Sequence, residues 1–326
     1  MVSWILEDGE PLPSADERHG IVELKVSEYA EIEWAELSGL PALERLTLNG
    51  WGIHDLDFLP VLPRLRRLTI DPCPDLEDVS ALLRQPSLTH LELCSGARTD
   101  LDRLNVETLA RLTGLRSLGF SRDGLPDLSF VAGMTVLERL DLFSVVLRDL
   151  GPLAGCAALR KLNLDGCDEL AGVEPLAGLP DLGELWLSGP VTADLAPLAG
   201  TPLERLVIQH RRVKDLPVDL ESIARIPGLE TLEILSADLV GLDGLAGSSV
   251  RVLRLGRCLR LTDLSAVGTL PNLESLRIAE AQALERVDLG SPRPALREVR
   301  FSDCRALTGI DDLRLAHPGI GIARSR

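Results

Sequence analysis

LERLDLFSVVLRDLGPL, the stretch from residue 137 to residue 153, contains two apolar patterns in succession. In the first, Leu140 and Leu142 alternate with polar residues, so both side chains point to one face of a short strand. In the second, Leu147, Leu150 and Leu153 recur every three residues and turn the chain back on the far side. One such repeat cannot bury its leucines alone, whereas stacked copies bury them between neighbours.

The pattern L-x-x-L-x-L recurs thirteen times, and most copies are 21 to 23 residues apart. A fixed period of this length is typical of a solenoid. We therefore predict a parallel sheet with one strand per repeat, adjacent strands being about 4.8 Å apart. The repeats begin at Ile21, Leu43, Leu65, Leu88, Leu115, Leu137, Leu159, Leu182, Leu203, Leu229, Val250, Leu273 and Leu296.

The repeat, with its I-x-D-L-x-P-L second half, resembles the leucine-rich repeat in its short, internalin-like form of bacterial cytoplasmic type. The resemblance covers residues 21–316. It implies an α/β leucine-rich-repeat solenoid, a curved arc with about 13 or 14 short parallel strands on the concave face and short turns on the convex face. Residues 1–326 are expected to form a single domain, with an N-terminal cap at 1–20 and a C-terminal cap strand and tail at 317–326.

Two repeats are longer than the others, and both carry an extra segment of helical character. The segments begin at Asn105 and Asp219, each a residue type that caps a helix, and continue with apolar residues at helical spacing. We predict two helical insertions on the convex face.

Eight aspartates share one column, directly before the second apolar pattern of their repeats. A stack of carboxylates would suit a metal ladder. Their position indicates capping instead, because a side-chain oxygen there can accept backbone N–H groups and start the convex turn. The eight are Asp55, Asp78, Asp100, Asp127, Asp149, Asp194, Asp215 and Asp263.

Four of the six cysteines, Cys73, Cys167, Cys258 and Cys304, stand nine places into their repeats. The family usually has asparagine at this place, and its side chain satisfies the loop backbone. Since this chain lacks asparagine there, the resemblance predicts irregular turns. We interpret the four as small buried thiols rather than zinc ligands, because they lie in separate repeats. Cys94 differs, because its strand position faces the concave surface, where an exposed thiol would be open to reaction.

Composition limits the classes of partner. The formal net charge of −16 argues against nucleic acid and anionic membranes, both of which need a basic field. No apolar stretch reaches the roughly 18 residues of a membrane span, and the start lacks a signal-peptide pattern. With scattered cysteines, these features favour a cytoplasmic protein. We expect a monomer with no cofactor and no metal.

Known catalytic patterns are missing from the sequence. It has no phosphate-binding G-x-x-x-x-G-K-[ST] loop, no H-E-x-x-H and no G-x-S-x-G. The five histidines lie in different repeats or at the ends. An enzyme is therefore not expected.

The third, fifth and seventh places of each repeat point out of the concave sheet, where most residues are polar, as a solvated face requires. In the middle repeats these places hold Phe143, Trp186, Val207 and Leu235. Apolar anchors ringed by arginine and mixed charge are typical of a protein-binding hot spot, although isolated exposed apolar residues are ordinary. The polar residues expected around them are Arg139, Asp141, Lys161, Asp165, Arg205, Gln209 and His210.

A second feature is a column of arginines, Arg254, Arg277 and Arg300, at the fifth place of three consecutive repeats. Stacked like charges are destabilising unless they have partners. One interpretation is a set of ion pairs. The alternative is a stripe that binds an anion, either an acidic segment or a phosphate, because the local field acts at contact distance even in an acidic protein. The acidic residues near enough to pair are Glu233, Glu280, Glu298 and Asp303.

The leading hypothesis is a non-enzymatic protein–protein interaction module that binds an unidentified protein on its concave face. The alternative is the recognition part of a larger regulatory switch. Similar repeat arrays form the sensor of nucleotide-binding immune-type ATPases, which this chain resembles in its repeats alone.

Overall fold

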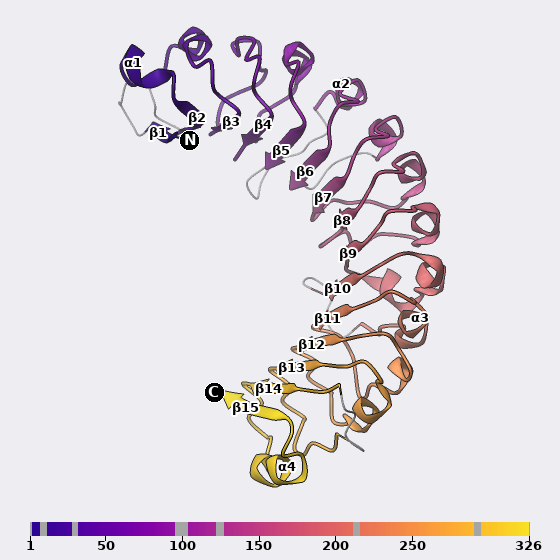
Figure 1. Ribbon diagram of the computed structural model, residues 1–326. Helices are drawn as coiled ribbons and strands as arrows, with labels where there is room; N and C mark the ends of the chain where they lie inside the picture. The colour runs from indigo at the N-terminus through magenta and orange to yellow at the C-terminus, as the bar shows by residue number, and fades with distance from the viewer. Residues whose placement is uncertain are drawn as a thin grey trace. The chain divides into compact units, whose positions relative to one another are not determined.

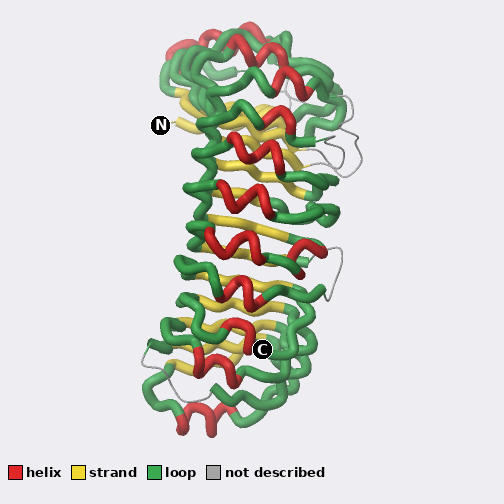
Figure 2. Tube along the Cα trace, turned by 90° about the vertical axis from the view of Figure 1, so that its right-hand side faces the viewer, coloured by secondary structure: helices red, strands yellow, loops and turns green. Residues whose placement is uncertain are grey.

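A computed structural model describes residues 2–6, 12–27, 32–94, 104–121, 127–210, 216–289 and 295–325 (Figure 1). The chain forms two compact units. The first comprises Met1–Val146 and Pro152–Leu159, and the second comprises Leu147–Gly151 and Arg160–Arg326. In each unit the strands form one layer and the short helices and turns form the opposite layer (Figures 1 and 2).

The strands are short, and within each unit every strand pairs in parallel with the next one along the chain. The first unit contains β1 (Val2–Leu6), β2 (Ile21–Val26), β3 (Arg45–Leu48), β4 (Arg67–Ile70), β5 (His90–Cys94), β6 (Ser117–Ser121) and β7 (Arg139–Phe143). The second contains β8 (Lys161–Asn163), β9 (Glu184–Leu187), β10 (Arg205–Gln209), β11 (Thr231–Leu235), β12 (Val252–Gly256), β13 (Ser275–Ala279), β14 (Glu298–Ser302) and β15 (Gly321–Ser325).

The return segments are mostly single turns of 3-10 helix. These are η1 (Trp34–Gly39), η2 (Ser80–Arg84), η4 (Ser129–Val131), η5 (Gly151–Gly155), η6 (Glu174–Gly178), η7 (Pro190–Ala193), η8 (Ala196–Gly200), η9 (Asp243–Leu245) and η10 (Ser265–Thr269). Four α-helical segments complete the described elements: α1 (Ala15–Arg18), α2 (Val106–Leu109), α3 (Leu220–Ala224) and α4 (Ile310–Ala316).

The core of each unit consists of the leucine columns that the repeat predicts. In β7, for example, Leu140 and Leu142 are fully buried, whereas Phe143 is exposed. Each buried leucine contributes roughly 1.5–3 kcal/mol relative to an exposed one, which is how stacking stabilises repeats that are unstable alone. The predicted leucine-rich-repeat solenoid is therefore confirmed.

The described residues contain 15 strands, whereas about 13 or 14 were predicted. The strand that was not predicted is β1, which pairs in parallel with β2. It places Leu6 in the core and leaves Ile5 exposed. The segment Val2–Leu6 lacks the leucine spacing of a repeat, so the sequence predicted an N-terminal cap but not that the cap contains a strand.

Both predicted helical insertions are present, as α2 and α3. The Asn105 side chain accepts a hydrogen bond from the N–H of Thr108, and Asp219 accepts one from Ser222. Each is therefore the N-cap residue that the sequence indicated.

The aspartate column starts the return turns, as predicted. In every described member a carboxylate oxygen accepts the N–H of the residue two places later. The six are Asp55, Asp78, Asp127, Asp149, Asp194 and Asp263. Asp100 and Asp215 lie outside the described residues.

The turns that follow the strands are more regular than the missing asparagines suggested. In seven repeats the eighth residue adopts a left-handed conformation: Ser144, Gly166, Gly189, Ser236, Arg257, Glu280 and Asp303. In the second unit the N–H of Ser236 donates to the carbonyl of Gly256 (2.8 Å), and that of Arg257 donates to Ala279 (2.9 Å). Glu280 and Asp303 donate to Ser302 and Ser325 in the same way. The prediction of irregular turns is therefore wrong for the last four of these repeats, because backbone groups extend the ladder without an asparagine.

Candidate interaction surface on the strand face

The first unit contributes three of the predicted surface residues, all on β7. The phenyl ring of Phe143 is 37% exposed at the end of the strand. Arg139 and Asp141 form an ion pair with each other on the same face. An exposed aromatic side chain therefore lies beside a locally neutral pair.

The second unit contributes an aromatic residue, Trp186, that contacts a neighbouring arginine on the strand face. Trp186, on β9, is half-buried, and the Arg205 guanidinium lies over its ring at 5.6 Å from the ring centroid. This distance is within the range of a cation–π interaction, worth about 0.5–1 kcal/mol at an exposed site. The stacked pair holds the indole in a fixed position while its remaining surface stays accessible.

Val207 stands next to Trp186 in the register, whereas Leu235 stands on β11, two strands from Trp186, and the structure places the two side chains differently. Leu235 is half-buried at the end of β11, where its side chain lies over Gly256; an added Cβ at Gly256 would approach it to 2.5 Å. Val207 pairs in register with Trp186 but is 3% exposed. The Val207 side chain therefore lies on the strand face but is covered by its neighbours. The prediction that a partner could contact it is wrong.

His210 and Asp165 are also buried, at 2% and 6% exposed. At the seventh and eighth places the chain leaves the strand, so the alternation of a strand no longer sets the direction of a side chain. The Nδ1 atom of His210 accepts a hydrogen bond from Gly189, and its Nε2 lies 3.4 Å from the Thr192 hydroxyl. The prediction that these two residues form the surface is wrong, and His210 connects two turns instead.

The three stacked arginines have the acidic partners that one interpretation required. Arg254 lies 3.4 Å from Glu233, and Arg277 lies 3.6 Å from Glu298, measured between nitrogen and oxygen. Arg300 also pairs with Glu298. Glu280 pairs with Arg257 beyond the strands. Hydrogen bonding from Arg300 is the largest cause that lowers the pKa of Glu298, so this carboxylate is ionised at neutral pH.

Glu184 belongs to the surface in addition to the predicted residues, and forms an ion pair of 2.7 Å with Lys161. Glu233, predicted as a partner of the arginine column, also lies 3.5 Å from Arg205. Both glutamates stand at outward places of their strands, so the register alone could have identified Glu184. Exposed pairs of this kind contribute about 0.2–1 kcal/mol each, and they fix side chains more than they stabilise the fold.

The cysteines do not form a site. Cys73, Cys167, Cys258 and Cys304 are buried, as predicted. Cys94 is half-buried at the end of β5, and burial together with Glu92 raises its pKa to about 12. A thiol with this pKa is protonated at neutral pH, which removes the nucleophilic thiolate.

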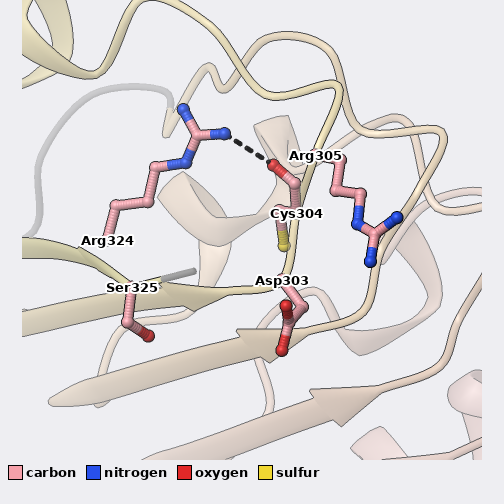
Figure 3. Close-up of a pocket in the computed structure, with 5 residues that line it drawn as sticks. All are labelled: Asp303, Cys304, Arg305, Arg324 and Ser325. Atoms are coloured by element: carbon pink, nitrogen blue, oxygen red, sulfur yellow. Dashed lines mark hydrogen bonds between the residues drawn. The ribbon is translucent and has the colours of Figure 1, made fainter.

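A hollow of about 670 Å³ lies beside the last two strands, β14 and β15, and is lined by Asp303, Cys304, Arg305, Arg324 and Ser325 (Figure 3). The Arg324 guanidinium donates to the carbonyl oxygens of Cys304 (3.0 Å) and Leu307 (2.8 Å). Because its donors point to the backbone, we assign Arg324 to stabilisation of the last turn.

In the part of the chain that the structure describes, no group of three or more His, Cys, Asp or Glu side chains is arranged to hold a metal ion. No helix there has both the length and the apolar character needed to cross a membrane.

Comparison with known proteins supports the fold. Internalin F (InlF) of Listeria monocytogenes matches 95% of this chain and 88% of its own, with 21% identity and a TM-score of 0.55. Internalin C2 of the same species matches 70% of this chain and 85% of its own, with 23% identity and a TM-score of 0.43. The first likeness shows an internalin-like leucine-rich-repeat fold.

One curated relative matches by sequence. A Trypanosoma equiperdum protein named "Putative adenylate cyclase regulatory protein" is 31% identical over 160 residues, which is 48% of this chain. The match spans a quarter of that protein's length. No protein-family model matches the chain.

Proposed function

We propose that this chain is a non-enzymatic, cytoplasmic interaction module that acts as a monomer and binds a protein partner on its strand face. The observation that carries the proposal is Trp186, an aromatic side chain held by Arg205 on a mostly polar strand face. Tryptophan and arginine are the residues most enriched among interface hot spots. Repeat solenoids also offer extended surfaces that suit protein partners.

Several surrounding features support this proposal. Leu235 adds half-buried apolar surface on β11, two strands from Trp186, and Phe143 adds an exposed ring on the first unit. The ion pairs of Lys161 and Arg205 place charged groups around Trp186. Charges at an interface contribute more to the specificity and the rate of association than to the affinity. The six free cysteines fit a reducing compartment.

The test is the affinity for a partner captured from native cytoplasm, compared between wild type and Trp186→Ala. We expect a loss of about tenfold to hundredfold, because truncating a hot-spot residue costs about 1.4–3 kcal/mol. Phe143→Ala should weaken binding as well. Trp51→Ala is the matched control, because Trp51 is a 55% exposed tryptophan outside the strands.

The control should keep the wild-type affinity, and all variants should keep the wild-type circular dichroism. Full affinity in both Trp186→Ala and Phe143→Ala would show that the strand face is not the binding surface.

The second candidate is a regulatory role, as the recognition part of a larger switch such as a nucleotide-binding immune-type ATPase. The curated relative, whose name refers to regulation of adenylate cyclase, supports a regulatory role in general terms. Turnover of a captured ATPase or cyclase, measured with and without this chain, tests this candidate. An unchanged rate at saturating chain would contradict it.

A further inference from the structure

The fifth-place residues of six adjacent strands form one column across the strand face of the second unit. From β9 to β14 the column reads Trp186, Val207, Glu233, Arg254, Arg277 and Arg300, each in register with the next. Parallel strands are about 4.8 Å apart, so the column spans about 24 Å from Trp186 to Arg300. It therefore begins with an aromatic side chain and ends with three cations.

Basic groups outnumber acidic groups along this column. Glu233 is shared by Arg205 and Arg254, and Glu298 is shared by Arg277 and Arg300. Four arginines thus share two glutamates, which leaves an excess of positive charge on this part of a chain whose net charge is −16. At physiological ionic strength charges are screened over about 8 Å, so the local excess decides what binds at contact.

The arginines also retain unused hydrogen-bonding capacity. Arg205, Arg254 and Arg277 lie 3.4–3.6 Å from their glutamates, beyond the 2.7–2.9 Å typical of a charge-assisted hydrogen bond, whereas Arg300 is hydrogen-bonded to Glu298. The Nε atoms of Arg205 and Arg254 are buried with no acceptor among the described residues. A guanidinium offers five N–H donors in a planar fork that fits a carboxylate. An incoming carboxylate would bind terminal guanidinium N–H donors that the two glutamates leave unused, because the Nε atoms themselves are buried.

We infer that this column binds an acidic, extended peptide segment, with an apolar side chain against Trp186 and carboxylates on Arg254, Arg277 and Arg300. The inference rests on the proposed function and names the partner chemistry of the same face. An extended chain advances about 3.3 Å per residue. Arg254 and Arg300 lie three and five strands from Trp186, so the carboxylates fall about four to seven residues from the apolar anchor.

The overall charge favours a short acidic segment over a nucleic acid. A nucleic acid carries its charges along its whole length and gains affinity by neutralising many phosphates. The basic excess here is confined to the column, and Lys161 beside it is already paired with Glu184. Polyanion binding is therefore the outcome that would overturn the assignment.

The test uses a fluorescein-labelled dodecapeptide with one leucine and with glutamates four, five, six and seven residues after it. The reference peptide has glutamines in place of the glutamates. We expect the glutamate peptide to bind at least tenfold more tightly in low salt, with the difference shrinking as added salt screens the charges. In the double variant Arg254→Gln with Arg277→Gln, the difference should disappear.

Arg251→Gln is the matched control. Arg251 stands three residues before Arg254, pairs with Glu230 and Glu274, and lies just before β12 rather than in the fifth-place column. It should leave the peptide affinity unchanged. Equal binding of the two peptides, equal loss in Arg251→Gln, no binding up to about 1 mM, or tighter binding of a dodecameric oligothymidylate would each overturn the inference.

The captured partner separates this inference from the proposed function. If Trp186→Ala weakens the partner but the double arginine variant does not, the acidic-segment inference fails and the proposed function stands. If both Trp186→Ala and Phe143→Ala leave the partner's affinity unchanged, the proposed function itself fails.

Discussion

The backbone N–H of Gly189 donates to Nδ1 of His210 across 3.3 Å, which connects the turn after β9 to the turn after β10. Because Nδ1 accepts this bond, the ring proton of the neutral imidazole belongs on Nε2, which faces the Thr192 hydroxyl. A second proton on Nδ1 would place an N–H against an N–H in a buried site. Burial lowers the pKa of His210, while the charge of Asp168 opposes this shift.

We expect the second unit to lose stability as the pH falls below about 6.5, the usual pKa of histidine. The folded state holds His210 neutral, so the unfolded state binds more protons in this range, and the free energy of unfolding decreases as the pH decreases. The contribution is fully present above the unfolded pKa and is lost as the pH falls through the folded pKa. Urea unfolding between about pH 7.5 and pH 5.5 measures it.

His210→Gln should reduce this pH dependence, because glutamine does not titrate. His54→Gln is the control, because the His54 side chain is well exposed and its ring lies 4.0 Å from Glu77. An identical pH dependence in wild type and His210→Gln would contradict the argument.

We expect Gly189→Ala to destabilise the second unit by about 2 kcal/mol or more. Gly189 has a φ of +79°, a left-handed conformation that costs other residues about 1–2 kcal/mol. An alanine Cβ would also approach the Cα of Asp168 to 2.8 Å. Urea unfolding monitored by circular dichroism measures the change.

Gly200→Ala is the matched control, because an added Cβ there meets nothing within 4 Å and the residue lies in η8 without a positive φ. It should be neutral or slightly stabilising, because alanine loses less conformational entropy on folding. Similar unfolding midpoints for the two variants would show that the turn tolerates a side chain.

The strands were predictable because the leucine spacing fixes both their period and their buried face. The same alternation indicated the direction of Val207 correctly but not its exposure, which depends on the side chains around it. At the strand ends the alternation stops, which is why Asp165 and His210 were placed on the wrong side. The cation–π contact of Arg205 with Trp186 depends on side-chain conformation, which a sequence pattern does not encode.

The conformation of the turns after the strands could not be predicted from the repeat pattern. The pattern specifies an asparagine in these turns, so its absence predicted irregular turns. Backbone conformation at the preceding residue, such as Ser236, supplies the regularity instead. Aspartate tolerates the left-handed region better than most residues, but Ser236, Arg257 and Glu280 adopt it too, so residue type alone does not predict it.

We expect Asp263→Ala to destabilise the second unit by about 1 kcal/mol, the usual effect of removing a capping residue. The Asp263 carboxylate accepts the N–H of Ser265 at 2.8 Å, and hydrogen bonds from Ser265 lower its pKa. The urea midpoint measures the loss. Asp263→Asn is the control, because its amide oxygen can still accept the N–H, so it should lose much less. Equal losses in the two variants would assign the effect to charge rather than to capping.

Cys94 provides a chemical test of the strand face in the first unit. Its pKa of about 12 means that almost no thiolate is present near neutral pH, and iodoacetamide reacts with the thiolate. We expect the native chain to be alkylated at Cys94 far more slowly than the urea-unfolded chain, with mass spectrometry locating the label. We also expect Glu92→Gln to increase the alkylation rate, because the charge of Glu92 raises the pKa of Cys94 and the Glu92 Oε1 lies 3.8 Å from the thiol. Burial is the larger cause of the raised pKa, so the variant should still react more slowly than the unfolded chain. Rapid labelling of native Cys94 would show instead that the thiol is exposed and reactive, the alternative that its strand position first suggested.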